Sequence, residues 1–571
     1  MSASVSSITA AAGERVVIPL TCTAPTAGQA VHVDGMKSLL SVPTAVIDAT
    51  THDYLAPYRD RTRGWRTDSS DIPDEVLAGT AGDEILADLA RAAAAVSDRS
   101  FGRVVDSIIA SRAGTFSAIP SFKAAPLVLL DYLRHDMIDG WVYKRERDGH
   151  LHPYLVAGIT VIAPANKGDQ PSMRLRLRAD NAAAGSRDKF TSDSYITLYP
   201  ADVTRKKPAD VLLAMGLHKE TAELKADHEA EVGRYLARLA GTFAHQYRFT
   251  GRPFGNDTWR EETERTNRKV INDLKPSELP AMRGTSPTDL LPEDAVAPVP
   301  MLTLFSVFDL HTHSFYVANS RDLTEYEYDK TLRDKLILPD DQRELLDILT
   351  SDIDTFTGDI IEGKSSGNVI LAKGEPGVGK TLTAEVYSEV IERPLYSIHS
   401  GTLGITAPDV RSNLETVFKR AKRWDVVLLL DEADVFVLTR GENIQQNAIV
   451  AEFLRTLEYF DGLLFMTTNR ANDIDDAILS RCAAIIDYRV PGPEDARKVW
   501  AVLAAGHGVT LPDSLLSDLV DGYGHIAPRD IKMLLRLALR VAASRGVPLS
   551  ADIFRQCGMF RGLQWRSGKS A

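Results

Sequence analysis

An eight-residue segment constrains the fold of this chain more than any other sequence feature. It follows an apolar run at residues 368–372, typical of a buried strand, and precedes a helical pattern at residues 382–391. Its form is G-x-x-x-x-G-K-T. In a strand–loop–helix context, such glycines let backbone N–H groups point inward around phosphates, and the helix N-terminus adds its positive dipole end. We therefore predict a nucleotide-phosphate cradle consisting of Gly374, Glu375, Pro376, Gly377, Val378, Gly379, Lys380, Thr381 and Leu382.

Two side chains of this loop have predicted chemical roles. The Lys380 ammonium group is expected to reach the β and γ phosphates of ATP, and the Thr381 hydroxyl group is expected to ligate Mg²⁺. The predicted cofactors are therefore ATP and Mg²⁺.

A second motif follows 51 positions after Lys380, where five apolar residues at 426–430 end in Asp431 and Glu432. A strand buried on both faces of a parallel sheet has this pattern, and such sheets bind ligands at the carboxyl ends of their strands. We predict that Asp431 binds Mg²⁺, directly or through water. Glu432 is predicted to be the base that orients and polarises the attacking water.

A third apolar run, at residues 463–468, is followed by Asn469 and Arg470, and then by the segment 475–481, which ends in Arg481. With these motifs in this order, residues 339–558 resemble the AAA ATPase family. The resemblance implies that Asn469 is the sensor-1 residue that positions the water with Glu432. It also implies that Arg481 is the arginine finger that reaches the nucleotide of a neighbouring subunit. The alternatives are a turn asparagine and a surface arginine, with Arg440 and Arg470 as other candidates for the finger.

Beyond residue 491, helical patterns at 495–505 and 531–543 fit the small lid domain that the resemblance implies. The resemblance also implies that Arg529 stands at the sensor-2 position, where an arginine of many AAA+ proteins contacts the γ-phosphate in cis; the alternative is a helix-surface arginine. The loop at residues 400–407 lacks the aromatic residue of family members that thread polypeptides. Leu403 or Ile405 could provide a weaker apolar contact, and the alternative is a plain connecting loop.

The region before the ATPase motifs is predicted to be mixed α and β. It has strand-like alternation at 15–20 and 174–178, a helical pattern at 84–96, and helices across 209–246 broken at Gly216, Gly233 and Gly241. Six prolines between 276 and 300 indicate a linker. A strand pair is expected at 302–307 and 314–318, and we interpret His311 and His313 as strand histidines, because no third metal ligand stands nearby.

The expected fold class is therefore α/β, with a P-loop parallel-sheet AAA+ core and a small all-α lid, preceded by a mixed α+β region. The expected domains are a recognition region at 1–272, a proline-rich linker at 273–300, a strand pair and connector at 301–338, the large ATPase domain at 339–490, and the lid with its tail at 491–571.

The composition of the chain limits which kinds of partner and location are expected. The formal net charge of −12 argues against general nucleic-acid binding, and we interpret the small clusters at 204–207 and 259–269 as surface charge. No apolar stretch approaches the roughly 20 residues of a membrane span, and the N-terminus lacks the features of a secretory signal, so a cytoplasmic location is expected. Three widely spaced cysteines, Cys22, Cys482 and Cys557, favour reduced thiols.

The resulting hypothesis is an oligomeric ring ATPase, a hexamer by family resemblance, that remodels or disassembles a protein partner recognised by the N-terminal region. The alternatives are a nucleic-acid motor or loader, since one fold can host both tasks, and a nucleotide-gated scaffold.

Overall fold

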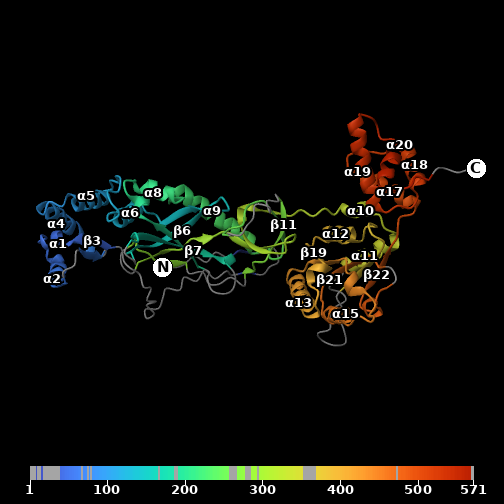
Figure 1. The fold of residues 1–571 in the computed structure, drawn as a ribbon, viewed down its shortest axis with the longest axis horizontal. Helices are drawn as coiled ribbons and strands as arrows, with labels where there is room; N and C mark the ends of the chain where they lie inside the picture. Colours follow the sequence, from blue (N-terminus) through green and yellow to red (C-terminus); the bar gives the residue numbers. More distant parts are fainter. Residues whose placement is uncertain are drawn as a thin grey trace, which may run out of the picture.

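The structure is a computed structural model. It describes the pairs 8–9 and 15–16 and residues 39–65, 69–73, 76–77, 80–164, 168–184, 191–255, 267–276, 284–291, 295–351, 368–470 and 473–566. The predicted strand at 15–20 lies almost wholly outside these residues, as do Cys22 and most of the cluster at 259–269. Figure 1 shows an elongated molecule with the N-terminal elements at one end and the nucleotide-loop elements at the other.

The described region from residue 39 to residue 134 is mainly helical, and it contains one short antiparallel pair of strands, β3 with β4. Apolar residues recur at helical spacing, as in Ile85, Leu86 and Leu89, and they bury one face of each helix in a shared core. The elements are β3 (Leu39–Pro43), α1 (Thr44–Asp48), α2 (Ala56–Trp65), β4 (Ser69–Pro73), α4 (Gly82–Ala95), α5 (Arg99–Arg112) and α6 (Ala125–Arg134).

Two sheets follow. The first has the order β14-β7-β6-β5-β9, with β8 also paired to β7, and only the β14 pairing is parallel. The second is antiparallel, in the order β16-β15-β11-β10-β17. Their strands are β5 (Trp141–Arg145), β6 (Leu151–Ile162), β7 (Ser172–Asn181), β8 (Thr191–Leu198), β9 (Leu217–Lys219), β14 (Met301–Leu302), β10 (Gln246–Phe249), β11 (Arg268–Asn272), β15 (Leu304–Asp309), β16 (Phe315–Asn319) and β17 (Leu323–Glu325).

The pattern at 209–246 forms three elements: α8 (Pro208–Ala214), β9 and α9 (Ala222–Leu239). Gly216, with φ 71°, ends the first helix as predicted, whereas Gly233 lies inside α9, where helix packing outweighs the weak propensity of glycine. His311 and His313 lie in the turn between β15 and β16, so their assignment to a strand was wrong. In the part of the chain that the structure describes, no group of three or more His, Cys, Asp or Glu residues could hold a metal ion.

The described parts of residues 273–300 differ from the linker that the prolines indicated. β12 (Thr285–Pro287) pairs with β13 (Val296–Pro298), and Ala297 and Val299 are buried against Trp141. The Trp141 indole N–H donates to the Pro298 carbonyl oxygen over 2.7 Å. Prolines fit here because each lacks an N–H donor and these two-stranded pairings leave edges open.

The nucleotide-loop part is built on a five-stranded sheet, in the order β19-β20-β21-β18-β22, whose pairings are all parallel. Apolar runs fill these strands because helices cover both faces. The strands are β18 (Asn368–Gly374), β19 (Leu395–His399), β20 (Val427–Asp431), β21 (Leu463–Thr468) and β22 (Ala484–Tyr488); the helices are α10 (Leu332–Lys335), α11 (Asp340–Ser351), α12 (Lys380–Val390), α13 (Ala407–Trp424), α14 (Asp434–Val437), α15 (Ile444–Leu457) and α16 (Asp476–Leu479).

The last described helices form their own buried cluster, which includes Trp500, Leu519, Leu534 and Phe554. They are α17 (Pro493–Gly506), α18 (Asp513–Tyr523), α19 (Pro528–Arg545) and α20 (Ala551–Phe560), and Figure 1 shows them projecting to one side of the parallel sheet. Sequence patterns predicted α17 and α19 only. None of the helices in the described ranges is long and apolar enough to cross a membrane.

The second antiparallel sheet packs directly on the nucleotide-loop part. Phe308 of β15 lies 4.7 Å, between ring centroids, from Trp424 at the end of α13, and the Trp424 indole N–H donates to Asp273 over 2.7 Å. The Lys269 ammonium lies 3.2 Å from the Glu389 carboxylate at the end of α12. Aromatic and ionic contacts therefore fix one part on the other.

Candidate functional site

The glycine loop turns sharply between β18 and α12. Gly374, Gly377 and Gly379 have φ values of 144°, 83° and 110°, in a region that side chains rarely allow. A Cβ on Gly374 would also lie 2.1 Å from the Tyr488 carbonyl oxygen. Gly379 caps α12 without a side-chain hydrogen bond, so the first backbone N–H groups of the helix remain for a ligand.

Lys380 is the buried cation of the site, with 6% of its surface exposed. Its ammonium group donates to the carbonyl oxygens of Gly374 (2.8 Å) and Glu375 (2.7 Å) and to the side-chain oxygen of Asn469 (3.0 Å). Burial lowers the pKa of Lys380, against the pull of Asp434 and Asp431. All three hydrogen-bond acceptors are uncharged, so an anion at this point would stabilise the ammonium.

Asp431 is the last residue of β20, and Glu432 follows it at the same edge of the sheet. The Asp431 carboxylate accepts hydrogen bonds from the hydroxyl groups of Thr381 (2.9 Å) and Thr467 (2.6 Å). Glu432 is exposed and has a left-handed backbone, with φ 54°. The oxygens of Thr381 and Asp431 suit Mg²⁺, which binds proteins through few ligands and completes its octahedron with phosphate and water.

Asn469 is positioned by Asp434, a residue whose role the sequence did not reveal. One Asp434 oxygen accepts from the Asn469 backbone N–H (2.9 Å) and from the Thr468 hydroxyl (2.5 Å). The side-chain oxygen of Asn469 then faces Lys380. Thr467, Thr468 and Asp434 were missed because a polar strand end gives no indication of which hydroxyl meets which acid.

These groups converge on a cleft of ≈ 490 Å³. Apolar residues outside the predicted motifs form much of its lining and suit the nucleobase and sugar of a nucleotide. They come from the segment before the sheet and from α17: Leu336, Ile337, Leu338, Val499, Val502 and Leu503. Val378, Leu382 and Arg529 also line the cleft, and the Arg529 backbone N–H donates to the Gly377 carbonyl over 3.1 Å.

A larger hollow of ≈ 820 Å³ lies alongside, between the antiparallel sheet and α12. It shares Leu382 and Glu385 with the cleft, but its lining does not contain Lys380, Asp431 or Glu432. We therefore regard the smaller cleft as the candidate site, because the glycine loop, the lysine and the acids meet there.

Arg481 lies outside the cleft. Its guanidinium donates to the Ala477 carbonyl over 3.0 Å and lies 3.8 Å from Glu458, and a third of the side chain is exposed. Arg440 instead forms two hydrogen bonds to the buried Asp475, at 2.8 and 3.3 Å, and Arg470 lies 4.0 Å from Asp473. A position away from the cleft of its own chain is what a trans residue requires.

In the loop between β19 and α13, Leu403 is buried and packs in the core, whereas Ile405 is 78% exposed. The Gln445 side-chain N–H donates to the Ile405 carbonyl over 3.1 Å, and Ile444, the residue before Gln445, is also apolar and exposed. Of the two apolar candidates in this loop, only Ile405 is available for contact.

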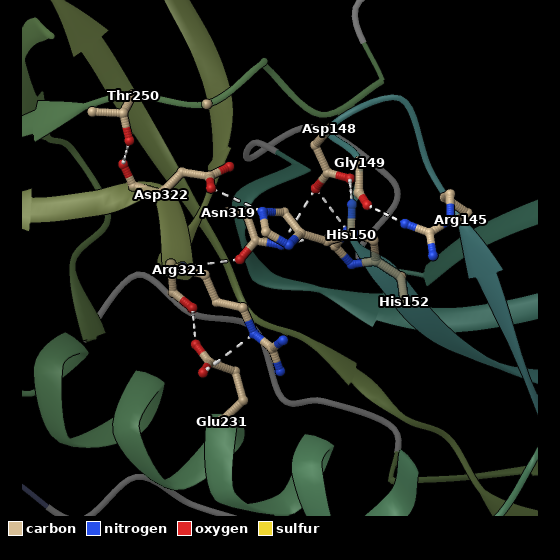
Figure 2. A network of polar contacts seen from close by, with 12 residues as sticks. Arg145, Asp148, Gly149, His150, His152, Glu231, Thr250, Asn319, Arg321 and Asp322 are labelled. Atoms are coloured by element: carbon tan, nitrogen blue, oxygen red, sulfur yellow. Dashed lines mark hydrogen bonds and ion pairs between the residues drawn. The ribbon is translucent and has the colours of Figure 1, made fainter. Parts of the chain in front are cut away.

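A second polar network lies in the N-terminal part (Figure 2), where the β5–β6 turn meets the segment after β16. Asp148 is buried and lies 2.7 Å from the His152 ring nitrogen Nε2, and Asn319 donates to the same carboxylate over 3.3 Å. The His150 ring lies 2.8 Å from Asp322. Each carboxylate of this network is paired with a histidine, and none of these five residues lines the cleft that contains Lys380.

Comparison with known proteins agrees with the nucleotide-loop part. Residues 370–490 match the family described as "ATPase family associated with various cellular activities (AAA)". The chain is 30% identical over 128 residues to an uncharacterized AAA family ATPase of Sinorhizobium fredii, covering 21% of this chain and 38% of the relative. It is 28% identical over 160 residues to a proteasome-associated ATPase of Acidothermus cellulolyticus, covering 23% of this chain and 27% of the relative.

The chain thus spans well under half the length of these curated relatives. One solved structure, titled "Structure of E. coli MS115-1 HORMA:CdnC:Trip13 complex", matches with TM-score 0.33 and 19% identity over 40% of this chain and 90% of that chain, and at that score it carries no argument. The AAA resemblance predicted from the motifs is confirmed for residues 370–490, and the match to this family implies an α/β P-loop fold there.

Proposed function

We propose that this protein is an Mg²⁺-dependent ATPase of the AAA+ kind that remodels or disassembles a protein partner. The observation that carries the ATPase proposal is the buried Lys380 ammonium, whose three hydrogen-bond acceptors are uncharged, at the mouth of a glycine loop. A triphosphate would supply the missing negative charge. Magnesium, held through Thr381 and Asp431, would neutralise charge on the phosphates.

The remaining residues divide the chemistry. Glu432 accepts a proton from the attacking water, and Asn469, fixed by Asp434 and Lys380, orients that water. Arg529, beside Gly377, contacts the γ-phosphate from the same chain. Arg481 reaches the nucleotide of a neighbouring subunit, where its charge stabilises the transition state.

The subunit arrangement follows from this division. Because Arg481 lies outside the cleft of its own chain, a second copy of the chain would have to supply the arginine finger for each site. We therefore propose a homo-oligomeric ring, a hexamer by family resemblance. The four C-terminal helices act as the lid, because Val499, Val502 and Arg529 line the nucleotide cleft. A location in the cytoplasm is part of the same proposal.

A protein client fits better than nucleic acid. The formal net charge is −12, and one of the relatives with a related AAA segment is named a proteasome-associated ATPase. In our proposal the N-terminal part recognises the client, and its aromatic and ionic contacts with α12 and α13 carry nucleotide-driven movements to it.

The direct test of the ATPase is Glu432→Gln, measured by phosphate release from the full chain with ATP and Mg²⁺. We expect turnover to fall about 100-fold or more, because general-base catalysis contributes that much, while ATP binding persists. Glu442→Gln, at an exposed carboxylate outside the cleft, is the matched control. Turnover at the wild-type rate by Glu432→Gln would show that the catalytic assignment is wrong.

The shared site is tested by mixing. Lys380→Ala subunits and Arg481→Ala subunits should each be inactive, and their mixture should regain partial turnover at interfaces that combine an intact loop with an intact finger. No recovery at any ratio contradicts a trans role for Arg481.

The client is sought by affinity capture with Glu432→Gln, which should remain ATP-bound and retain its protein partner. Stimulation of turnover by single- or double-stranded DNA, without any stimulation by protein fractions, would support the nucleic-acid alternative. Binding of ATP without turnover by the wild-type chain would support the nucleotide-gated scaffold.

A further inference from the structure

The sheet divides at the hydrolysis site. β20 pairs with β21 from Val427 opposite Leu463 to Leu430 opposite Met466, and the pairing ends there. On its other side, β21 stays paired with β18 as far as Thr468. Asp431 and Glu432 therefore lie beyond the β20–β21 pairing, next to Thr467, although Asp431 is still paired with His399 of β19. The position of both acids matters for the proposed reaction.

The Thr467 side chain bridges this gap. Its hydroxyl group donates to the Asp431 carboxylate over 2.6 Å and accepts from the Glu432 backbone N–H over 3.0 Å. A carboxylate can only accept and a backbone N–H can only donate, so one orientation of the hydroxyl satisfies both. The Thr467 carbonyl oxygen accepts from the Ala433 N–H over 2.8 Å, which extends the same connection by one residue.

The bond to Glu432 acts on a backbone that is unfavourable without support. Glu432 has φ 54°, a conformation that residues with a Cβ adopt rarely. Thr467 is almost fully buried, so water does not compete for its hydroxyl group. The hydrogen bond thus fixes the peptide that directs the exposed Glu432 carboxylate into the cleft.

We propose that Thr467 is a positioning residue for ATP hydrolysis, whose hydroxyl group holds the Glu432 base in place at the point where β20 separates from β21. The proposal rests on the ATPase function proposed above. Thr467 does not act on ATP itself; it acts through Glu432, and through the acid that holds magnesium.

The experiment compares Thr467→Val, which keeps the shape of the side chain but has no hydroxyl, with Thr467→Ser, which keeps the hydroxyl. Phosphate release from the full chain gives kcat, a fluorescent ATP analogue gives Kd, and thermal unfolding reports on the fold. Thr456→Val is the matched control, because the Thr456 hydroxyl donates over 2.8 Å to the Glu452 carbonyl oxygen within α15.

We expect Thr467→Val to lower kcat about tenfold to 100-fold, since a small misplacement of a catalytic group has effects of this size. Kd should stay within about threefold, and Thr467→Ser should restore most of kcat. Thr456→Val should behave as wild type. If Thr467→Val unfolds early, Thr467→Ala, compared with Thr467→Ser, provides the same comparison.

Two outcomes overturn the proposal: a wild-type kcat in the variants without a hydroxyl, or a loss of nucleotide affinity that matches the loss of kcat. Glu432→Gln, run in parallel, separates this proposal from the previous one. If Glu432→Gln is inactive while Thr467→Val turns over normally, only the positioning role fails. If Glu432→Gln turns over normally, the ATPase assignment fails with it.

Discussion

The nucleotide cleft and the Asp148 network (Figure 2) are both dense polar clusters with a buried ionisable group, yet their charges are handled differently. Asp148 meets His152, Asn319 and the His150 backbone N–H, so its negative charge is compensated inside the protein. Lys380 has good hydrogen-bond geometry, but its acceptors are two carbonyls and an amide. Its charge is solvated and not neutralised.

The difference indicates which cluster awaits a ligand. Breaking a buried, compensated pair leaves an uncompensated charge in the protein interior, which lowers the free energy of unfolding. Removing a buried cation that faces a cleft takes a desolvated charge out of the ligand-free protein. It should therefore weaken ligand binding without lowering the stability of the ligand-free protein. Loss of stability should therefore mark the first region and loss of affinity the second.

The largest effect is expected from Asp148→Asn. Burial alone raises the pKa of Asp148, but the His152 hydrogen bond and charge hold it below its usual value, so the carboxylate is ionised and paired. Losing this charge should lower the free energy of unfolding by about 3–5 kcal/mol, measured by chemical denaturation. Nucleotide affinity should not change.

Asp136→Asn, at an exposed carboxylate in the same part of the chain, is the control for this substitution. A change below about 1 kcal/mol in Asp148→Asn would mean that the network is not a structural pair, and the contrast with the cleft would be lost.

The next effect is a pH dependence at His228, which packs edge-to-face on Trp141, with ring centroids 5.7 Å apart. Burial, together with the charges of His152 and Arg321, lowers the pKa of His228 to about 4. Between its usual pKa near 6.5 and about 4, the unfolded chain binds a proton that the folded chain does not. The stabilising contribution of neutral His228 is therefore complete above pH 6.5. As the pH falls from 6.5 to 4, this contribution is lost and the free energy of unfolding decreases by about 3 kcal/mol.

His228→Phe keeps a ring against Trp141 and cannot take the proton. Its free energy of unfolding, subtracted from that of the wild type at each pH, isolates the contribution of His228 from other titrating groups. A difference that stays flat from pH 7 to pH 4.5 would contradict a buried, neutral His228.

Lys380→Ala is predicted to act in the opposite manner. ATP affinity should fall about 100-fold, equivalent to about 2.7 kcal/mol, because the charge-assisted bonds to the phosphates are lost. The unfolding midpoint without nucleotide should stay or rise slightly, since a desolvated cation is removed. Lys419→Ala, at an exposed lysine of α13, is the control, and titration calorimetry measures the affinity.

These two regions also differ in how far the sequence could predict them. Residues 374–381 and 426–432 are contiguous motifs, so the loop, the strands and the acids at their ends were predictable from local pattern. The Asp148–Asn319 contact joins residues 171 positions apart, and no periodicity encodes such a pair. The segment 273–300 was interpreted as a linker for the same reason: its prolines are local, whereas the packing of Val299 against the Trp141 cluster is long-range.

Within the site, sequence predicted residue types better than partners. The β21 hydroxyls of Thr467 and Thr468 contact Asp431 and Asp434 because parallel strands bring their carboxyl ends together, a relation that appears only after folding. The apolar lining from residues 336–338 was missed because three apolar residues before a helix match many structures.

The smallest effect is expected at Ile405, which belongs to neither polar network. Its side chain is 78% exposed, so Ile405→Ser removes little buried surface and should change the free energy of unfolding by less than about 0.5 kcal/mol. Basal ATPase turnover and ATP affinity should stay within about twofold, because the residue lies outside the cleft.

Stimulation of turnover by an unfolded model protein should fall if the exposed Ile405 contacts a polypeptide. Leu403→Ser, which places a hydroxyl in the core beside Val410, should instead unfold the chain at lower temperature. If both variants lose stability and stimulation to the same extent, exposure in this loop does not distinguish a contact residue from a packing residue. If Ile405→Ser loses stimulation alone, the loop contacts a client and is not a plain connecting loop.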